Sequence, residues 1–304
     1  MQSSGEQTTS SHSPFRVLHP QEAERYYDHA LYEIEGPLSH VLQLSWTMRW
    51  DLPADVAFGA RVVPSAYANL TCMPEGARVT GVTTGLYDYQ IRGSGVIVGV
   101  MFRPGGIAAF FDSPRDLVDT HLPAQRLFPA VDEEFNNEVI ASSDGAALKR
   151  IHEQLLAHLP APDPNISLIN EIIERSQTAK ESTVRSIAKE FAMSERKLQS
   201  LFERYVGVGL KWIMLRDRLQ RATLPADTLA APNWTEIAHE LGYGDQSHFI
   251  HDFKRIVGMT PRQYALANHR RTYLGAQSQN GFPGRDSTQN TGTLTVRAEP
   301  EKRS

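Results

Sequence analysis

Two stretches of this 304-residue chain repeat one another, and the repeat constrains the fold more than any other feature. Residues 183–207 and 234–258 share apolar, small and helix-capping residues, with one extra residue in the turn of the second copy. The matched pairs are Ile187 and Ile237, Ala188 and Ala238, Ser194 and Asp245, Leu198 and Phe249, Phe202 and Phe253, and Gly207 and Gly258. Each copy therefore predicts two helices joined by a turn of three or four residues, a helix-turn-helix.

The residue types fit that arrangement position by position. Ala188 and Ala238 are small enough for the two helices of each copy to cross closely. Ser194 and Asp245 can cap the second helix, because their side-chain oxygens accept hydrogen bonds from free amides of the first turn. With the apolar residues placed inside, each second helix exposes polar side chains. On the first copy these are Arg196, Lys197, Gln199, Ser200, Glu203 and Arg204, and on the second Gln246, Ser247, His248, His251, Lys254 and Arg255.

The exposed residue types are those that read DNA. Gln, Arg, Ser and His can bond base edges, whereas Lys and Arg neutralise phosphates. Residues 209–222 form an amphipathic spacer of about 20 Å at 1.5 Å per residue. Two helices about one DNA turn (~34 Å) apart can enter successive major grooves. Plain solvated helix faces are the alternative, but two copies with the same caps, core and turn favour double-stranded DNA as the partner.

Composition agrees with this interpretation and bounds the compartment. The net charge is −4, yet acidic residues dominate before residue 166 and basic residues dominate over 166–271, which fits a C-terminal nucleic-acid-binding domain. No apolar run approaches the roughly 20 residues that span a bilayer, and Met1–Pro14 lacks the apolar core of a signal peptide. The one cysteine, Cys72, excludes an intrachain disulfide and a thiolate metal cluster. We therefore expect a cytoplasmic protein without membrane contact.

The chain is long enough for two domains, and its patterns divide accordingly. Short β-branched and aromatic runs at 40–50, 68–73, 78–82 and 95–102 predict a β-rich sandwich or barrel. Short turns or helices are expected at 106–111 and 114–119, and two helices between 132 and 158. The predicted class is a two-domain α+β protein, whose all-α second domain holds two helix-turn-helix motifs joined by a linker helix. The expected segments are a disordered 1–14, a β-rich domain 15–159, a linker 160–165, a DNA-binding domain 166–271 and a disordered tail 272–304.

The C-terminal pattern resembles the AraC-type family of bacterial transcription regulators over about 100 residues. The motifs are Ser194-x-Arg-x-Leu-x-x-x-Phe202, Gly207, Leu215-x-x-x-Leu219, Ile237-Ala238, Gly242-Tyr243, Asp245-Gln-Ser-His-Phe249, Phe253-Lys254 and Gly258-Met-Thr-Pro261. The resemblance implies that the base-reading residues are Arg196, Gln199, Ser200, Gln246, Ser247, His248 and His251. This chain departs from many members at Gly209-Leu210 where they have Ser-Pro, at Ser200 where they have Arg, and at His251 where they have Arg or Ser.

The front half more loosely resembles an uncharacterised β-rich domain that precedes such DNA-binding halves. The matching pieces are Trp50-Asp-Leu-Pro53, Pro64 with Asn69-Leu70, and Gly99-Val-Met-Phe-Arg-Pro-Gly-Gly106. The family uses this half for binding an effector, for dimerisation, or for both. Aromatic residues that either line a ligand pocket or pack the core are Trp46, Trp50, Tyr67, Tyr87 and Tyr89. Gly105-Gly106 predicts a tight turn, with an anion-binding loop as the alternative.

Enzymatic interpretations find little support in the sequence. His29, His40 and His121 are scattered and lack His-x-His spacing. His248 and His251 are three residues apart on a predicted helix, but no third metal ligand is evident. Nucleophile-elbow, phosphate-loop and dinucleotide motifs are lacking, so we expect no catalytic residue, metal or cofactor.

The predicted function is a sequence-specific DNA-binding regulator controlled by a small-molecule effector or by homodimerisation, with RNA polymerase as a further partner. A ligand-independent dimeric regulator and an enzyme domain fused to a DNA-tethering module remain the alternatives.

Overall fold

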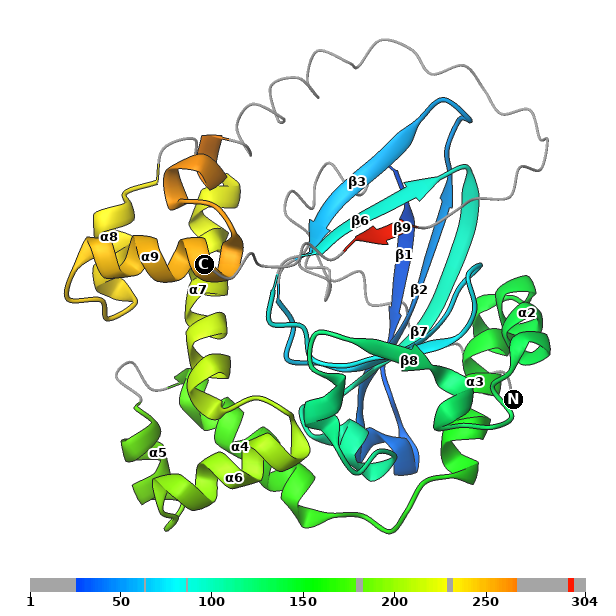
Figure 1. The fold of residues 1–304 in the computed structure, drawn as a ribbon, viewed down its shortest axis with the longest axis horizontal. Helices are drawn as coiled ribbons and strands as arrows, with labels where there is room; N and C mark the ends of the chain where they lie inside the picture. The colour runs from blue at the N-terminus through cyan, green and yellow to red at the C-terminus, as the bar shows by residue number, and fades with distance from the viewer. Residues whose placement is uncertain are drawn as a thin grey trace.

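The protein has the predicted two-domain α+β architecture. The computed structural model describes residues 26–62, 64–85, 87–178, 183–228, 232–266 and 295–297. A β-rich front domain stands beside a helical C-terminal domain, and the long helix α7 (Leu210–Thr228) runs along the side of the helical domain that faces the sheets (Figure 1). The predicted disordered segment 1–14 lies outside the described residues.

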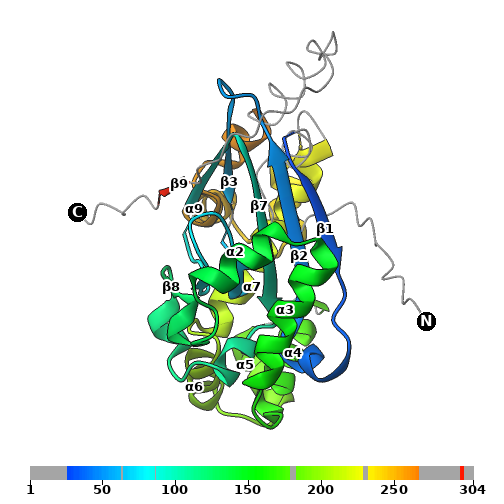
Figure 2. The ribbon, with the colours of Figure 1, turned by 90° about the vertical axis from the view of Figure 1, so that its right-hand side faces the viewer.

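Two antiparallel sheets form the front domain. The larger has the order β1 (Asp28–Tyr32), β2 (Leu42–Asp51), β7 (Ser94–Phe102), β4 (Asn69–Cys72), β5 (Arg78–Thr80) and β8 (His121–Pro123). The smaller has the order β3 (Ala57–Val62), β6 (Tyr87–Arg92) and β9 (Thr295–Arg297). Short 3-10 helices lie between or after strands of the larger sheet: η1 (Gly36–His40), η2 (Gly106–Ala109), η3 (Pro114–Leu117) and η4 (Ala124–Arg126). Helices α2 (Glu133–Ala141) and α3 (Asp144–Ala157) follow and cross the strands (Figure 2).

The structure confirms the four predicted strands and the helix pair between 132 and 158, and it adds elements that the pattern did not predict. Strands β1, β3 and β6 combine apolar residues with polar ones, and β3 also contains Gly59, so they lack the short apolar runs on which the prediction rested. Thr295–Arg297 pairs with β6, so the prediction of a wholly disordered tail is wrong for these three residues. A Thr-Val-Arg segment has the β-branched residues that an open sheet edge accepts.

Alternation along β7 separates two cores. Val98, Val100 and Phe102 pack with apolar residues of α2 and α3 on one face of the larger sheet. Ile97 and Met101 face the smaller sheet, where Trp46, Trp50, Phe58 and Ile91 complete a second cluster that we call the inter-sheet core. This alternation follows from the two-residue period of a strand, and it places the front domain's aromatic residues between the sheets.

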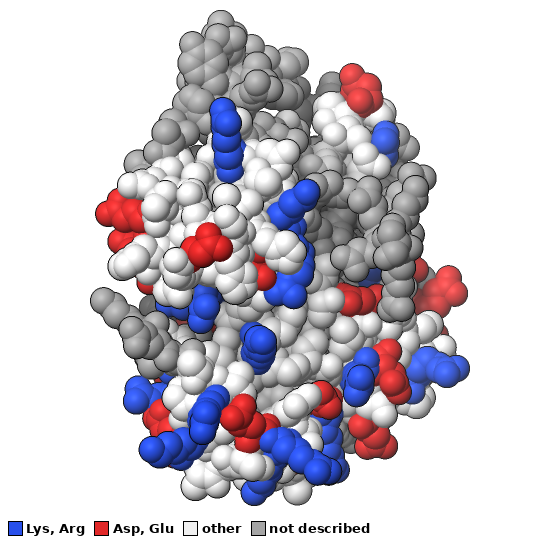
Figure 3. All heavy atoms as spheres, turned by 60° about the vertical axis from the view of Figure 1, so that its left-hand side comes forward, with Lys and Arg blue, Asp and Glu red and all other residues white. Residues whose placement is uncertain are grey.

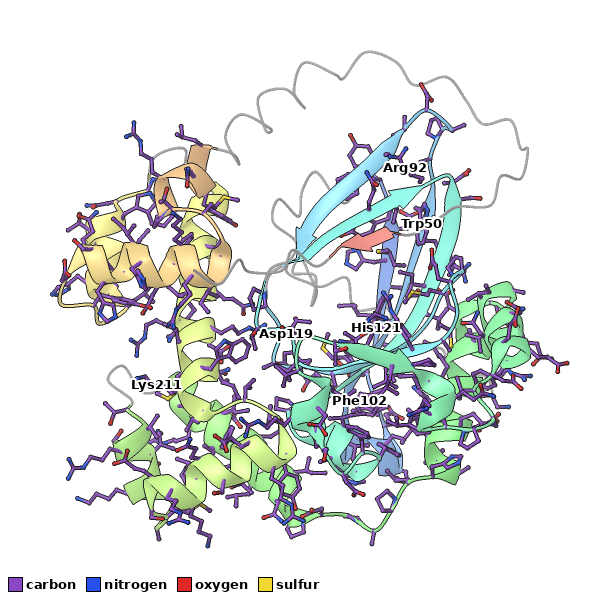
Figure 4. The ribbon with its side chains drawn as sticks, viewed as in Figure 1. Trp50, Arg92, Phe102, Asp119, His121 and Lys211 are labelled. Atoms are coloured by element: carbon purple, nitrogen blue, oxygen red, sulfur yellow. The ribbon has the colours of Figure 1, made fainter. Side chains whose placement is uncertain are left out.

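Two tryptophans of β2 lie against glycines of β7 in the inter-sheet core. Trp46 pairs with Gly99 and Trp50 with Gly95 across the two strands. A Cβ atom on Gly99 would lie 2.8 Å from the Trp46 ring, and one on Gly95 would lie 2.2 Å from the Trp50 ring. The Trp50 indole also donates a hydrogen bond to the Arg92 carbonyl of β6 over 3.1 Å and so connects the two sheets (Figure 4). Trp46 and Trp50 are thus core residues.

A polar network fixes α3 on the outer face of β1 and β2. Asp144, the first residue of α3, accepts hydrogen bonds from Tyr32, Thr47 and Arg49. Burial raises the pKa of Asp144, but the hydrogen bonds from Arg49, Thr47 and Tyr32 outweigh it and leave the pKa below the ordinary value. Two turns further along α3, His152 Nε2 lies 2.7 Å from the buried Ser45 hydroxyl.

The His152 contact predicts a loss of stability in mild acid. Burial lowers the pKa of His152 below 6.5, so the unfolded chain binds a proton more readily than the folded protein. The His152 contribution is complete above pH 6.5 and is lost as the pH falls from there through the folded-state pKa. We expect the midpoint of urea unfolding to fall over this range in the wild type, and to fall less in His152→Gln. Equal slopes in both proteins would contradict this, and the Asp144 contribution is lost only at lower pH.

The C-terminal domain contains helices α4 (Pro164–Thr178), α5 (Val184–Glu190), α6 (Glu195–Tyr205), α7, α8 (Trp234–Glu240) and α9 (Gln246–Val257), followed by a helical turn at 261–266. Two apolar clusters hold it together, one under α5 and α6 and one under α8 and α9. The first cluster includes Ala66 and Val82 of the front domain beside Ile169 and Ile173 of α4. The two domains therefore share apolar packing rather than hanging from a free linker.

Candidate nucleic-acid interface

The two repeats fold into two helix-turn-helix units with the predicted caps. Ser194 Oγ accepts the Lys197 amide over 3.2 Å and so caps α6. Asp245 accepts the Ser247 amide over 2.8 Å and the His248 amide over 3.3 Å at the start of α9. The hydrogen bonds from the Ser247 and His248 amides keep the pKa of Asp245 below its ordinary value. Both caps thus fix the angle at which the second helix leaves its turn.

The turns differ in the residue that takes the left-handed conformation. Ala192 has φ +50° in the first copy, whereas Gly242 has φ +77° in the second. After the second helices, Gly207 and Gly258 have φ +89° and +73°, so both matched glycines occupy conformations that L side chains rarely adopt. The repeat is thus present in backbone geometry as well as in sequence.

The structure exposes every predicted DNA-reading side chain. The exposed residues on α6 are Arg196, Lys197, Gln199, Ser200 and Arg204, and those on α9 are Gln246, Ser247, His248, His251, Lys254 and Arg255. In the left half of Figure 1, α9 lies beside the upper end of α7 and α6 lies below its lower end. Basic side chains are distributed over both units on the face of the molecule that Figure 3 shows. Lys211, at the start of α7, is also exposed (Figure 4).

On α6, an acidic residue interacts with a predicted base reader. Gln199 Nε2 donates to Glu203 Oε1 over 2.9 Å, one helical turn along. The other carboxylate oxygen of Glu203 lies 3.9 Å from Nη1 of Arg115, a front-domain residue in η3 whose side chain is 74% exposed. The front domain therefore reaches the polar face of the first helix-turn-helix. Arg115 is distant along the chain from Glu203, so no local pattern could have identified it.

On α9, a buried carboxylate lies among the exposed side chains. Asp252 is only 7% exposed and accepts from Arg255 over 3.0 Å and from the Tyr243 hydroxyl over 3.3 Å. His248 Nε2 is 3.5 Å from the same carboxylate, and His251 Nδ1 is 3.9 Å away. Burial and the negative charge of Asp252 raise the pKa of Tyr243, so its hydroxyl stays protonated and donates. The repeat could have identified Asp252, because the matched position in the first copy holds Leu201.

A third polar site joins the domains. Arg216 and Asp217 of α7 are only 8% and 9% exposed. Arg216 donates to the Pro64 carbonyl over 3.0 Å and to Asp217 over 2.7 Å, and its guanidinium lies 5.9 Å from the centre of the Tyr67 ring. Asp217 accepts from Gln177 of α4 over 2.6 Å. We call these five residues the α7 joint.

The remaining candidates have structural explanations. A Cβ atom on Gly106 would lie 2.1 Å from the Val41 carbonyl oxygen, which fits the tight turn predicted at Gly105-Gly106. Tyr67 packs against the inter-sheet core, whereas the Tyr87 and Tyr89 side chains lie outside the described part of the structure. Among the described residues, no group of three or more His, Cys, Asp or Glu residues is arranged to hold a metal ion. None of the described helices has the length and apolarity needed to cross a membrane.

Comparison with known proteins supports the family resemblance. Residues 187–267 match the family described as "Helix-turn-helix domain", and residues 35–123 match "Domain of unknown function (DUF6597)". The chain is 32% identical over 103 residues to the F1 operon positive regulatory protein of Yersinia pestis, covering 33% of each chain. It is 27% identical over 166 residues to an AraC-like transcription regulator of Streptomyces antibioticus, covering 47% of this chain and 54% of the relative.

One solved structure is similar to about a third of this chain. The C-terminal domain of the two-component response regulator yesN from Fusobacterium nucleatum is 30% identical, and the match covers 34% of this chain and 99% of that domain with a TM-score of 0.30. The chain thus spans between a third and about half of the length of the two curated relatives above. The residues that match the helix-turn-helix family, 187–267, contain nearly all of the two helix-turn-helix units. The C-terminal domain is thus an AraC-type helix-turn-helix domain, and through it the chain is similar to AraC-type transcription regulators.

Proposed function

We propose that this protein is a sequence-specific DNA-binding transcription regulator whose helices α6 and α9 enter two adjacent major grooves. The supporting observation is that two capped helices near opposite ends of one long helix expose Arg, Lys, Gln, Ser and His side chains, the types that bond base edges and phosphates. At 1.5 Å per residue, the 19 residues of α7 extend about 28 Å, close to the ~34 Å of one DNA turn. We assign base reading to Arg196, Gln199, Ser200, Gln246, Ser247, His248 and His251, and phosphate contacts to Lys197, Arg204, Lys254 and Arg255.

We further propose that the front domain controls the DNA-binding geometry by binding an effector or a second copy of the chain. The support is the α7 joint, where the front domain contacts the helix that separates the two recognition helices. An effector that favours one packing of the inter-sheet core over another would shift the Tyr67 ring. The shift would change the position of the Arg216 guanidinium, which lies over that ring. The effector could change the free-energy difference between the two packings by at most the difference between its binding free energies for them.

The test uses the full chain with promoter fragments and random duplexes. We expect tighter binding to one promoter fragment than to random DNA, an affinity that falls steeply with salt, and two protected major grooves about 10.5 base pairs apart on one face. Binding without sequence preference at every salt concentration would overturn the regulator. A thermal-shift screen of metabolites, with sedimentation at several concentrations, separates effector control from dimerisation.

Substitutions of two base readers provide the sharper test of the assignment. Gln246→Ala and Arg196→Ala should each weaken operator binding by about 1–3 kcal/mol and relax the preference at one base pair, because a hydrogen-bonding side chain is removed from a groove. Gln125→Ala is the matched control, since Gln125 is an exposed glutamine of the front domain. Quantitative binding to the operator and to its single-base variants gives the measurement. Equal losses on operator and random DNA would reassign both residues to phosphate contacts.

A further inference from the structure

Helix α9 has a buried carboxylate, Asp252, beneath the side chains that we assign to DNA contacts. An isolated buried charge is strongly unfavourable, and a negative charge close to DNA also opposes phosphate binding. Asp252 therefore depends on its partners. The groups around it are Arg255, His248 and His251 on α9, and Tyr243 in the turn. Arg218 of α7 lies 5.6 Å from the centre of the Tyr243 ring.

We propose that Asp252 is a positioning residue that orients His248 and Arg255 for contact with DNA. This inference rests on the proposed function and specifies how α9 achieves its base preference. Without a fixed partner, a long exposed side chain must lose rotamer freedom when it binds. Asp252 removes part of that loss in advance, because its carboxylate already contacts both side chains. Oδ1 accepts from Arg255, and Oδ2 lies next to His248 Nε2.

The contact also fixes how the His248 ring meets DNA. Nε2 of His248 points toward Asp252 Oδ2, and the ring stands edge-on to Tyr243, with ring centres 5.5 Å apart at 84°. A carboxylate next to Nε2 favours the proton on that nitrogen, which leaves Nδ1 of neutral histidine as an acceptor. Nδ1 then suits the amino group of adenine or cytosine, the donors of the major groove.

Asp252 also holds Arg255, through its other carboxylate oxygen. One of its terminal nitrogens donates to Asp252 Oδ1 over 3.0 Å, while more than half of the side chain remains exposed. A guanidinium has five N–H donors, so most of them stay available for a phosphate or for guanine. His248 and Arg255 thus share one buried anchor, and the loss of that anchor should affect both contacts together.

The experiment compares full-length wild type with Asp252→Asn, His248→Ala and Arg255→Ala on the selected operator, its single-base variants and random DNA. Asn is isosteric, so the variant removes charge with little change in packing. We expect Asp252→Asn to lower the ratio of operator to random affinity about tenfold, with random binding unchanged or tighter because a negative charge is lost. The base pair affected should be the one that His248→Ala affects. Glu195→Gln, an equal charge change on α6, should tighten both kinds of binding and preserve the ratio.

The outcomes separate the inference from the proposed function. A wild type without sequence preference overturns both. A wild type with preference, together with an Asp252→Asn variant that keeps the full ratio, overturns the inference alone. Equal losses on operator and random DNA, accompanied by a lower melting temperature, would show that Asp252 acts only in folding. Adding Asp252→Asn to the His248→Ala, Arg255→Ala double variant should cause no further loss of ratio, and a second tenfold loss would also overturn the inference.

Discussion

Arg216→Ala is expected to lower the free energy of unfolding by about 3 kcal/mol or more, the cost of removing one member of a buried ion pair. The substitution leaves the nearly buried Asp217 without its charged partner and the Pro64 carbonyl without its donor. Because Pro64 belongs to the front domain, the same change loosens the contact between the two domains. Urea unfolding, followed by circular dichroism and tryptophan fluorescence, measures the effect.

Arg221→Ala is the matched control for this prediction. Arg221 lies on the same helix and is exposed, so its removal should change stability by less than about 0.5 kcal/mol. A similar small effect in both variants would show that the α7 joint contributes nothing to stability. If the front domain acts through this joint, Arg216→Ala should also abolish any effector-dependent change in operator affinity while leaving effector binding intact.

Gly207→Ala is expected to destabilise the protein by about 3 kcal/mol, since it combines two unfavourable effects. Its φ of +89° is costly for any residue with a side chain. The new Cβ atom would also lie 2.8 Å from Val118 Cγ2 and 2.9 Å from the Pro114 carbonyl oxygen, both in the front domain. Overpacking of this kind typically costs a further amount of about 1–3 kcal/mol.

Gly242→Ala separates these two contributions. Its φ is +77°, but nothing lies within 4 Å of the position that its Cβ atom would take. We therefore expect a loss of only about 1–2 kcal/mol from backbone strain. The difference between the two variants measures the packing of η3 against the end of α6. Val118→Ala in the Gly207→Ala background should restore part of the loss, and equal losses in both glycine variants would contradict the contact.

The C-terminal domain was predictable because its determinants are local. Helix caps, apolar spacing and turn residues act within a few positions, so Ser194, Asp245 and the matched cores could be identified from their spacing. The exposure of the eleven candidate DNA-reading residues follows from the same periodicity. Asp252 was not singled out, although the repeat matches it with the apolar Leu201, and only the contacts with Tyr243, His248 and Arg255 explain a buried acid at that position.

The front domain was predicted less completely. Strands with clear apolar runs were found, whereas β1, β3 and β6 are stabilised by partners that are distant along the chain. Trp46 and Trp50 were assigned either to a pocket or to a core. The structure places both in the core, because each indole packs against a glycine of β7. The register of β2 against β7, rather than the composition of either strand, pairs each tryptophan with its glycine.

The sequence by itself determined two capped helix-turn-helix units, the faces that they expose and the family to which they belong, since these depend on short-range periodicity. Only the tertiary structure decided how the units are connected to the rest. Arg115 meets Glu203, Pro64 and Tyr67 meet Arg216, and Ala66 joins the core under α6, each across a long separation in sequence. Such contacts exist because folding brings distant surfaces together to bury apolar area, which leaves no periodic trace in the chain.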